Sequence, residues 1–315
     1  MKYNFGITGA GGFVAPRHLR AIKETGHELV SAVDPSDSVG VLDQYFPNAR
    51  FFTEFERFDR HAYKLALRGE EHGLHYVSVC SPNWLHDAHI RFALRNGAHA
   101  ICEKPLVLNP WNLDPLSQME EARDRKVYTI LQLRLHPSAV SLRKKLSDKG
   151  GDHKVDVDLT YVTSRGNWYL VSWKGDPARS GGIGTNIGIH FYDLLLWLFG
   201  SVQENVVHVS EPTRAAGFLE LERARVRWFL SVRGEDVPDA ARAEGARTYR
   251  SLSFDGEEFD FSAGFEDLHT VSYRDIFEGK GFGIEDARPS IELAHAVREA
   301  EPVGRKGSYH PFVKD

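Results

Sequence analysis

The order of short apolar runs in the first half of the chain constrains its fold more than any other feature. These runs are nearly continuous in apolar residues, which is typical of parallel strands buried on both faces of a sheet. Helical patterns separate them, and this alternation predicts a doubly wound α/β domain built on a parallel sheet. The five candidate strands are Tyr3–Thr8, Leu29–Asp34, Tyr76–Cys80, Ala98–Cys102 and Val127–Leu131.

The pattern changes near residue 150, after the polar stretch Asp148–Gly151. Apolar and polar residues alternate over Val155–Tyr161 and again over Ala224–Leu230, which indicates antiparallel strands with one exposed face. The remaining predicted elements are a buried helix over Ile189–Phe199, an exposed loop over Arg233–Ala246 and a final helix over Ile291–Arg298.

The length of 315 residues fits two domains, at about 100–200 residues per domain. We expect an N-terminal nucleotide-binding domain over residues 1–133. The second domain, over residues 134–315, is expected to be an α+β domain with an open, largely antiparallel sheet.

Composition and charge exclude several classes of protein. With 39 Lys and Arg against 44 Asp and Glu, the net charge of −5 argues against a general nucleic-acid binder. The longest apolar run, Leu194–Phe199, is far shorter than a membrane span of about 20 residues, and no apolar secretory segment opens the chain.

Cys80 and Cys102 fit a reduced, cytoplasmic protein with buried thiols, with a disulfide as the alternative. His86 and His89 share a helical face without an evident third ligand, so no metal site is expected.

A glycine-rich turn, Gly9-Ala10-Gly11-Gly12-Phe13-Val14, follows the first predicted strand and precedes a predicted helix. This is the position of a dinucleotide-binding turn, in which Gly9 permits a tight bend and Gly11 lets the backbone approach a pyrophosphate. The amides at the start of the helix then favour negative charge. Val14 stands where the motif prefers Gly or Ala, so helix and strand are expected to lie slightly farther apart. The alternative is a glycine-rich turn without a ligand.

Asp34 ends the second predicted strand. A dinucleotide-binding domain places there the acidic residue that accepts hydrogen bonds from the adenosine ribose. A carboxylate at this position repels the additional phosphate of NADP, and no Arg or Lys occurs in Pro35–Val39. We therefore expect NAD as the cofactor. The alternative is that Asp34 only caps a helix that follows Pro35.

Two further motifs follow strands that end at the same edge of the predicted sheet. Ser81-Pro82-Asn83 with His86 comes after the third candidate strand, and Glu103-Lys104-Pro105 comes after the fourth. Ligands of open α/β sheets bind at the carboxyl ends of strands, so both motifs are expected to face the cofactor. An ammonium group at Lys104 can stabilise a developing alkoxide. An ordinary surface lysine is the alternative.

With these motifs the chain resembles the Gfo/Idh/MocA oxidoreductase family, and the resemblance continues through Gly181-Gly182, His190 and Asp193. It implies that Lys104 and His190 are the catalytic pair. Where the family often has Asp four residues before the histidine, this chain has Asn186, which forms hydrogen bonds but cannot carry a proton. The resemblance also implies a Rossmann domain that binds NAD through Gly9, Gly11, Gly12, Phe13, Val14, Asp34, Ser81, Pro82, Asn83, His86, Glu103 and Lys104.

Longer strings resemble one subgroup of this family, the UDP-N-acetyl-2-amino-2-deoxy-D-glucuronate 3-dehydrogenases of the WlbA/WbpB type. The subgroup implies NAD-dependent oxidation of the C3′ hydroxyl of UDP-N-acetyl-D-glucosaminuronic acid to a ketone. It places that step in the synthesis of diacetamido uronic acid sugars for bacterial surface polysaccharide (O-antigen, lipopolysaccharide). It also implies a homotetramer and, for some members, reoxidation of NADH by 2-oxoglutarate. The strings are Leu131–Pro137, Thr163–Tyr169, Ser172–Asp176, Ser180–Asp193 and Gly281–Ser290.

Cationic and aromatic residues occur together in one segment of the second predicted domain. The cations Arg165, Lys174 and Arg179 lie close in sequence to the aromatic residues Trp168, Tyr169 and Trp173. This mixture suits the phosphates, carboxylate and ring of a nucleotide sugar acid. Aromatic packing with solvated charges is the alternative. The predicted substrate contacts are Lys104, Arg165, Tyr169, Lys174, Asn186 and His190.

The expected chemistry gives the catalytic pair complementary roles. His190 accepts the hydroxyl proton as general base, and Lys104 stabilises the forming alkoxide. The reverse assignment, with a deprotonated Lys104 as the base, stays open. Two other functions also stay open: a dehydrogenase of the same family that acts on another sugar or an inositol, and an NAD-binding regulator without catalysis.

Overall fold

The computed structural model of the chain describes residues 2–148, 154–259 and 267–314. The chain divides into two compact units: Met1–Leu135 with Glu266–Arg288, and His136–Phe265 with Pro289–Asp315. The first boundary follows residue 135, close to the predicted end of the first domain at residue 133. Residues 266–288 also belong to the first unit, and the sequence pattern did not predict this. Most of the polar stretch that marks the change of pattern lies outside the described residues.

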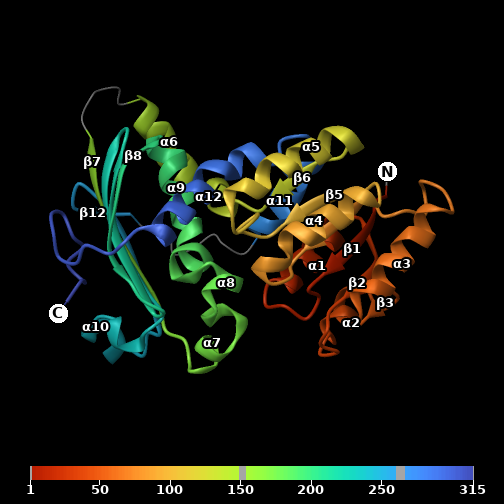
Figure 1. Ribbon diagram of the computed structural model, residues 1–315, viewed down its shortest axis with the longest axis horizontal. Helices are drawn as coiled ribbons and strands as arrows, with labels where there is room; N and C mark the ends of the chain where they lie inside the picture. Colours follow the sequence, from red (N-terminus) through yellow and green to blue (C-terminus); the bar gives the residue numbers. More distant parts are fainter. Residues whose placement is uncertain (1, 149–153, 260–266, 315) are drawn as a thin grey trace. The chain divides into compact units, whose positions relative to one another are not determined.

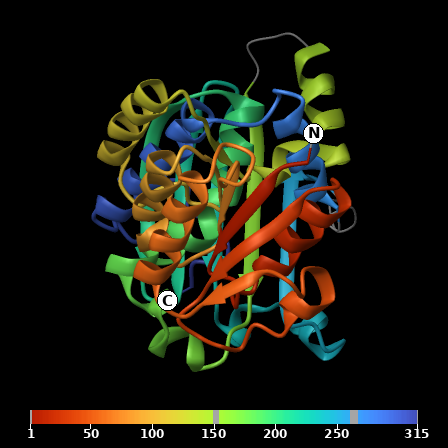
Figure 2. The same ribbon diagram turned by 90° about the vertical axis from the view of Figure 1, so that its right-hand side faces the viewer.

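A six-stranded parallel sheet forms the centre of the first unit, with the strand order β3-β2-β1-β4-β5-β6. This is the order of a Rossmann sheet, which confirms the predicted doubly wound α/β fold. Figure 2 shows its first strands, in red and orange, running side by side. The order reverses between β1 and β4, and ligands of such sheets bind at that point. The strands are β1 (Asn4–Thr8), β2 (Glu28–Val33), β3 (Arg50–Phe52), β4 (Tyr76–Val79), β5 (His99–Cys102) and β6 (Val127–Thr129).

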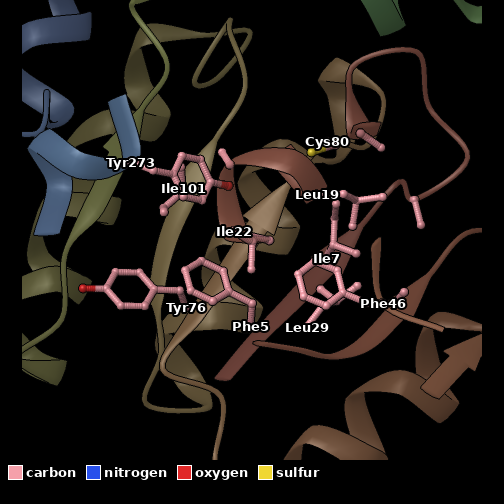
Figure 3. Close-up of a cluster of buried hydrophobic side chains, with 14 of the residues drawn as sticks. Phe5, Ile7, Leu19, Ile22, Leu29, Phe46, Tyr76, Cys80, Ile101 and Tyr273 are labelled. Atoms are coloured by element: carbon pink, nitrogen blue, oxygen red, sulfur yellow. The ribbon is translucent and has the colours of Figure 1, made fainter. Parts of the chain in front are cut away.

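Helices cover this sheet, and one of them comes from late in the chain (Figure 1). Phe5 and Ile7 of β1 pack with Leu19 and Ile22 of α1, and Tyr273 of α11 belongs to the same buried cluster (Figure 3). The helix α11 therefore completes the core of the first unit. The helices of this unit are α1 (Ala15–Glu24), α2 (Val41–Tyr45), α3 (Phe55–Ala66), α4 (His86–Arg95), α5 (Leu113–Arg123) and α11 (Leu268–Phe277), with short turns η1 (Asn83–Leu85), η2 (Pro110–Asn112) and η3 (Gln132–Leu135).

The second unit is built on a six-stranded sheet with the order β12-β11-β7-β10-β9-β8. All its strand pairs are antiparallel except β7 and β10, which run parallel. The sheet is therefore largely antiparallel as predicted, but the two strands recognised from their alternation pair in parallel with each other. The strands are β7 (Val155–Thr163), β8 (Val202–Ser210), β9 (Arg214–Leu221), β10 (Ala224–Ser231), β11 (Thr248–Phe254) and β12 (Glu257–Glu258).

The two faces of β10 differ from the predicted pattern at one residue. Arg225 and Arg227 lie on the more exposed face and pair with the aspartates opposite them in β7. The alternation over Ala224–Leu230 places Phe229 on the same face as these arginines, but Phe229 is buried. Its ring packs against those of His310 and Phe312, because the last residues of the chain cover this end of the face.

The helices of the second unit correct two further predictions. Arg233–Ala246 is not an exposed loop throughout, because it contains two short helices and buries Val237 in an apolar cluster. The last helix begins at Ile284 rather than Ile291, since it continues through Pro289. No described helix has the length and apolar character needed to cross a membrane. The helices are α6 (Pro137–Asp148), α7 (Trp168–Val171), η4 (Trp173–Gly175), α8 (Pro177–Ser180), the π-helical η5 (Gly184–Gly188), α9 (Ile189–Phe199), η6 (Gly234–Asp236), α10 (Asp239–Ala243) and α12 (Ile284–Glu299), which starts in the first unit.

Candidate active site

The glycine turn of the first unit packs directly against the end of β4. Gly9 has a φ of +78°, and a Cβ atom there would lie 2.5 Å from the Cys80 carbonyl group. Only glycine fits this conformation and this close approach. The Gly9 amide donates to the Val33 carbonyl at 2.9 Å, which ties the turn to β2. Val14 is the N-cap residue of α1 and offers no side-chain cap. The positive end of the helix dipole of α1 lies at this turn and favours a nearby anion.

Asp34 organises the rest of this turn. Its Oδ2 accepts a hydrogen bond from the Gly11 amide at 2.9 Å, and its Oδ1 accepts one from the Ser36 amide at 2.9 Å. It does not cap a helix, because α2 begins only at Val41. The carboxylate therefore lies beside the glycine turn, where an adenosine ribose is expected. Phe13, at the tip of the turn, is 86% exposed.

His86 links the two motifs that follow β4 and β5. Its Nδ1 lies 2.6 Å from the Pro105 carbonyl oxygen, and its Nε2 lies 2.8 Å from the Ser81 carbonyl oxygen. Burial lowers the pKa of this imidazole, and the two carbonyls partly oppose that effect. The Ser81 hydroxyl in turn lies 2.8 Å from Nδ1 of His89. Asn83 is buried at the start of η1. Both ring nitrogens of His86 thus lie against backbone carbonyl oxygens, and the neutral ring donates to one of them. Its predicted contact with NAD stays a prediction.

Glu103 is the centre of a buried polar network. Its Oε1 accepts hydrogen bonds from Nε2 of His18 and Nε2 of His269, both at 2.9 Å. Its Oε2 accepts one from the Lys104 amide at 3.3 Å. Burial opposes ionisation of Glu103, but the hydrogen bonds from the two histidines outweigh it and hold the pKa of this carboxyl well below its usual range. Lys104 itself is partly exposed, and its peptide bond to Pro105 is cis.

Three members of this network were missed by sequence reasoning. His18 lies on the apolar face of α1, and His269 and Tyr273 lie one turn apart on α11. The Tyr273 hydroxyl is 2.8 Å from Nδ1 of His18 and 2.6 Å from Oγ of Ser78. A polar residue within an apolar helix face was the available signal, but only the tertiary structure identifies its partners.

In the second unit, two predicted substrate residues contact each other. Nδ2 of Asn186, in η5, donates to the hydroxyl of Tyr169, in α7, at 3.0 Å. Tyr169 is only 2% exposed. Burial raises the pKa of its hydroxyl, and the effects of Asn186 and Arg165 partly oppose the rise. The phenol therefore stays protonated at neutral pH and keeps a proton to donate.

Arg165 and Lys174 form a cationic pair beside this contact. The Lys174 ammonium lies 4.3 Å from the centre of the Trp173 ring. Burial and the nearby charge of Arg165 both lower the pKa of Lys174. Within the described parts of the chain, neither cation has a carboxylate partner, whereas Arg179 pairs with Asp176 at 3.3 Å. Two close cations without a counter-charge are suited to an anionic ligand.

His190 is the second residue of α9 and follows the π-helical turn directly. It is partly exposed, while its neighbours Ile189 and Phe191 are buried. The turn packs closely, because a Cβ atom at Gly188 would lie 2.9 Å from the ring of Tyr192. Such turns are frequent at functional sites. Lys104 belongs to the first unit and His190 to the second, and their action on one substrate stays a prediction.

Family models match most of the chain. The model for the oxidoreductase family Gfo/Idh/MocA, NAD-binding Rossmann fold, matches residues 3–130. The model for the C-terminal alpha/beta domain of the same family matches residues 152–236.

One solved structure is similar over nearly the whole chain. It is the WlbA (WbpB) dehydrogenase from Thermus thermophilus, in complex with NAD and alpha-ketoglutarate. The two chains are 51% identical with a TM-score of 0.95, and the match covers 99% of this chain and 100% of that one. A second structure of the Thermus enzyme, with NAD and UDP-GlcNAcA, matches at 50% identity with a TM-score of 0.94, over 99% of this chain and 100% of that one.

Curated relatives are more distant. Glucose-6-phosphate 3-dehydrogenase of Bacillus subtilis is 29% identical over 62% of this chain and 53% of its own length. Oxidoreductase cns1 of Cordyceps militaris is 29% identical over 41% of this chain and 16% of its own length. The match thus spans about half of the first relative and a small part of the second.

Proposed function

The chain belongs to the Gfo/Idh/MocA oxidoreductase family, and we propose that it oxidises the C3′ hydroxyl of UDP-N-acetyl-D-glucosaminuronic acid to a ketone with NAD. The observation that carries this proposal is the full-length similarity to a dehydrogenase whose structures contain NAD and that sugar nucleotide. The residue chemistry of both units supports it independently.

The first unit fits NAD at its glycine turn. The absence of side chains at Gly9 and Gly11 leaves backbone beside the start of α1, where we place the pyrophosphate. Asp34 is placed at the adenosine ribose, and Ser81-Pro82-Asn83 is placed along the cofactor beyond it. Bound NAD supplies the hydride acceptor. The other proposed contacts of the turn are Gly12, Phe13 and Val14. We propose that His86 and Glu103 support the loops that follow β4 and β5.

The second unit supplies the proposed substrate contacts. Arg165 and Lys174 are placed at the phosphates or the carboxylate, because they are close together and lack a counter-charge among the described residues. Tyr169 and Asn186 are placed at the sugar, with the Tyr169 hydroxyl as donor. A nucleotide sugar acid carries negative charge on its two phosphates and its carboxylate, and these groups pair with cations.

The reaction removes a proton and a hydride from the same alcohol. We place His190 at the C3′ hydroxyl as general base, and Lys104 beside the oxygen, where its ammonium stabilises the alkoxide. Lys104 as the base is the reverse assignment. The two assignments predict different pH dependences of kcat, because only the residue that accepts the proton must be in its neutral form.

Wider features of the protein are proposed on the resemblance to its subgroup. We place the reaction in the synthesis of O-antigen and lipopolysaccharide sugars, and we propose that 2-oxoglutarate reoxidises the NADH. The similar complex with alpha-ketoglutarate supports the second point. We also propose a homotetramer. Both cysteines are free and buried, which supports a cytoplasmic location.

The test is an absorbance measurement on the purified protein with NAD and UDP-N-acetyl-D-glucosaminuronic acid. We expect the band of the reduced nicotinamide to grow and mass spectrometry to show a 3-keto sugar. UDP-N-acetylglucosamine, which lacks the carboxylate, is the matched control and should react much more slowly.

Glucose 6-phosphate tests the second candidate, a sugar phosphate dehydrogenase, which the similarity to the Bacillus enzyme favours. Binding of NAD without reduction by any of these compounds would overturn the proposed substrate class.

A further inference from the structure

We propose that three buried histidines of the first unit, His18, His86 and His269, are positioning residues for Lys104. We call these three residues the histidine clamp. The proposal rests on the proposed function, in which Lys104 acts on the substrate oxygen. None of the three is placed at the substrate. Each holds a residue adjacent to Lys104, and together they fix the backbone on both sides of it.

The clamp acts on both neighbours of Lys104. On one side, His18 and His269 donate to the same carboxylate oxygen of Glu103 at 2.9 Å. On the other side, Nδ1 of His86 lies 2.6 Å from the Pro105 carbonyl oxygen. The Glu103 carboxylate also accepts from the Lys104 amide. We assign the single proton of the neutral His86 ring to Nδ1, the nitrogen with the shorter contact, so the segment Glu103–Pro105 is held at a side chain, an amide and a carbonyl.

The hydrogen-bond pattern gives the first part of the clamp one orientation. His18 is fully buried, and burial lowers its pKa, so it is neutral and carries one ring proton. That proton lies on Nε2, because an ionised Glu103 can only accept. Nδ1 of His18 must then accept from the Tyr273 hydroxyl, whose oxygen accepts from Ser78. The chain of donors runs from β4 through α11 and α1 to Glu103, and it fixes the tautomer of His18.

A buried charged cluster is a poor source of stability, because well-packed apolar residues of similar volume do as well or better. Its benefit lies in orientation, since each member is satisfied only in one arrangement. A reacting group that is misplaced by about 1 Å can lose about 100-fold in rate. The position of the cluster, at the residue next to the predicted catalytic lysine, therefore favours a positioning role.

The same atoms must also be considered as a metal site. His18, Glu103 and His269 offer three ligand atoms within 4.8 Å of one another. A structural zinc site has four protein ligands, whereas a catalytic site has three and a water, at about 2.0–2.2 Å. The described residues offer three, and the two histidine nitrogens already lie at hydrogen-bond distance from the carboxylate. The geometry points to a hydrogen-bonded cluster, and the metal content of the purified protein tests this directly.

The first experiment compares two substitutions of His269. His269→Leu removes the donor, whereas His269→Gln retains an amide donor of similar reach. We expect the leucine variant to lower kcat about 10–100-fold, with the KM of the sugar nucleotide and the Kd of NAD within about threefold of the parent values. The glutamine variant should recover most of kcat. His75→Leu is the control, because His75 is another histidine of the first unit with a hydrogen bond, from the Asn4 amide to its Nδ1, but it lies away from the motif.

The second experiment does not depend on turnover. Hydrogen exchange of the Lys104 amide, followed in a peptide that covers residues 102–107, should become at least about tenfold faster in Glu103→Gln. Glu103→Gln conserves volume, so it also tests the proposal if His269→Leu does not fold. Unchanged exchange in this variant, full kcat in the folded leucine variant, or one bound metal ion per chain would each overturn the clamp. Failure of the parent protein to oxidise the sugar, with exchange faster as expected, would overturn the proposed function alone.

Discussion

Two regions of the molecule are built in opposite ways. The cofactor edge of the first unit consists of the glycine turn with Asp34 and the loops that carry His86 and Glu103. The cation cluster of the second unit is the pair Arg165 and Lys174. At the cofactor edge, each motif has partners within the chain: the Asp34 carboxylate accepts from two amides, the Glu103 carboxylate accepts from two histidines, and one ring nitrogen of His86 donates to a backbone carbonyl. In the cation cluster, Arg165 and Lys174 lie near each other with no carboxylate partner among the described residues.

The first region is preorganised for a ligand, whereas the second needs a bound anion to offset its positive charge. At the cofactor edge, the Asp34 and Glu103 carboxylates already have hydrogen-bond partners, so a ligand there meets a fixed surface, whose reorganisation costs little. The second unit carries charges that repel each other until an anion arrives. Substitutions at the cofactor edge should therefore reduce stability as well as function. Substitutions in the cation cluster should reduce affinity and leave stability almost unchanged.

The largest expected effect is at the proposed catalytic pair, with Lys104 in the first unit and His190 in the second. His190→Ala and Lys104→Ala are each expected to lower kcat by about 10²–10⁴, because each removes a group that acts in the transition state. NAD binding, measured by titration, should stay close to that of the parent in His190→Ala and weaken in Lys104→Ala, because Lys104 is also a predicted NAD contact. If one variant retains full turnover, the role of that residue is wrong, and the pair contributes from one unit only.

The pH profile then separates the two assignments of the base. With His190 as base, kcat falls at low pH as the imidazole takes up a proton, and His190→Ala removes that limb. With Lys104 as base, the limb persists in His190→Ala. The measurement is kcat against pH for the parent and the variant under saturating NAD and substrate.

The next effect tests the rigidity of the cofactor edge. Gly9→Ala places a Cβ atom 2.5 Å from the Cys80 carbonyl group, in a conformation with positive φ. We expect a loss of about 2–4 kcal/mol in the free energy of unfolding, measured with urea, together with weaker NAD binding. Gly26→Ala is the control, since Gly26 has a φ of +82° with nothing within 4 Å of its Cβ position. It should lose only about 1 kcal/mol. Equal losses would show that the close approach at Gly9 contributes nothing.

The sequence was informative where a pattern depends on neighbours along the chain. Five of the six strands of the first sheet have the continuous apolar character of buried parallel strands, and these five were predicted. β3 was missed because it has three residues and begins with the exposed Arg50. The glycine turn and the start of α1 at Ala15 were also predicted, since both follow from local backbone requirements.

The sequence was uninformative where a contact joins distant segments. Nothing local indicates that α11 returns to the first unit, so His269 could not be assigned to Glu103, nor Tyr273 to His18. Phe229 was misplaced for the same reason, because its cover comes from the last residues of the chain. The pairing of Lys104 with His190 is supported by family resemblance and remains to be tested.

The smallest of these effects would sharpen the description of the cation cluster. Arg165→Met and Lys174→Met should each raise the KM of the sugar nucleotide about 10–100-fold, because each removes a charge-assisted hydrogen bond worth about 1.5–3 kcal/mol. The melting temperature should stay the same or rise slightly, since the substitution relieves repulsion between like charges. Arg225→Met is the control, because Arg225 is paired with Asp156 on an exposed strand, where an ion pair contributes little. A fall in stability at Arg165 or Lys174 without a rise in KM would mean that these cations support the fold, and the contrast between the two units would then disappear.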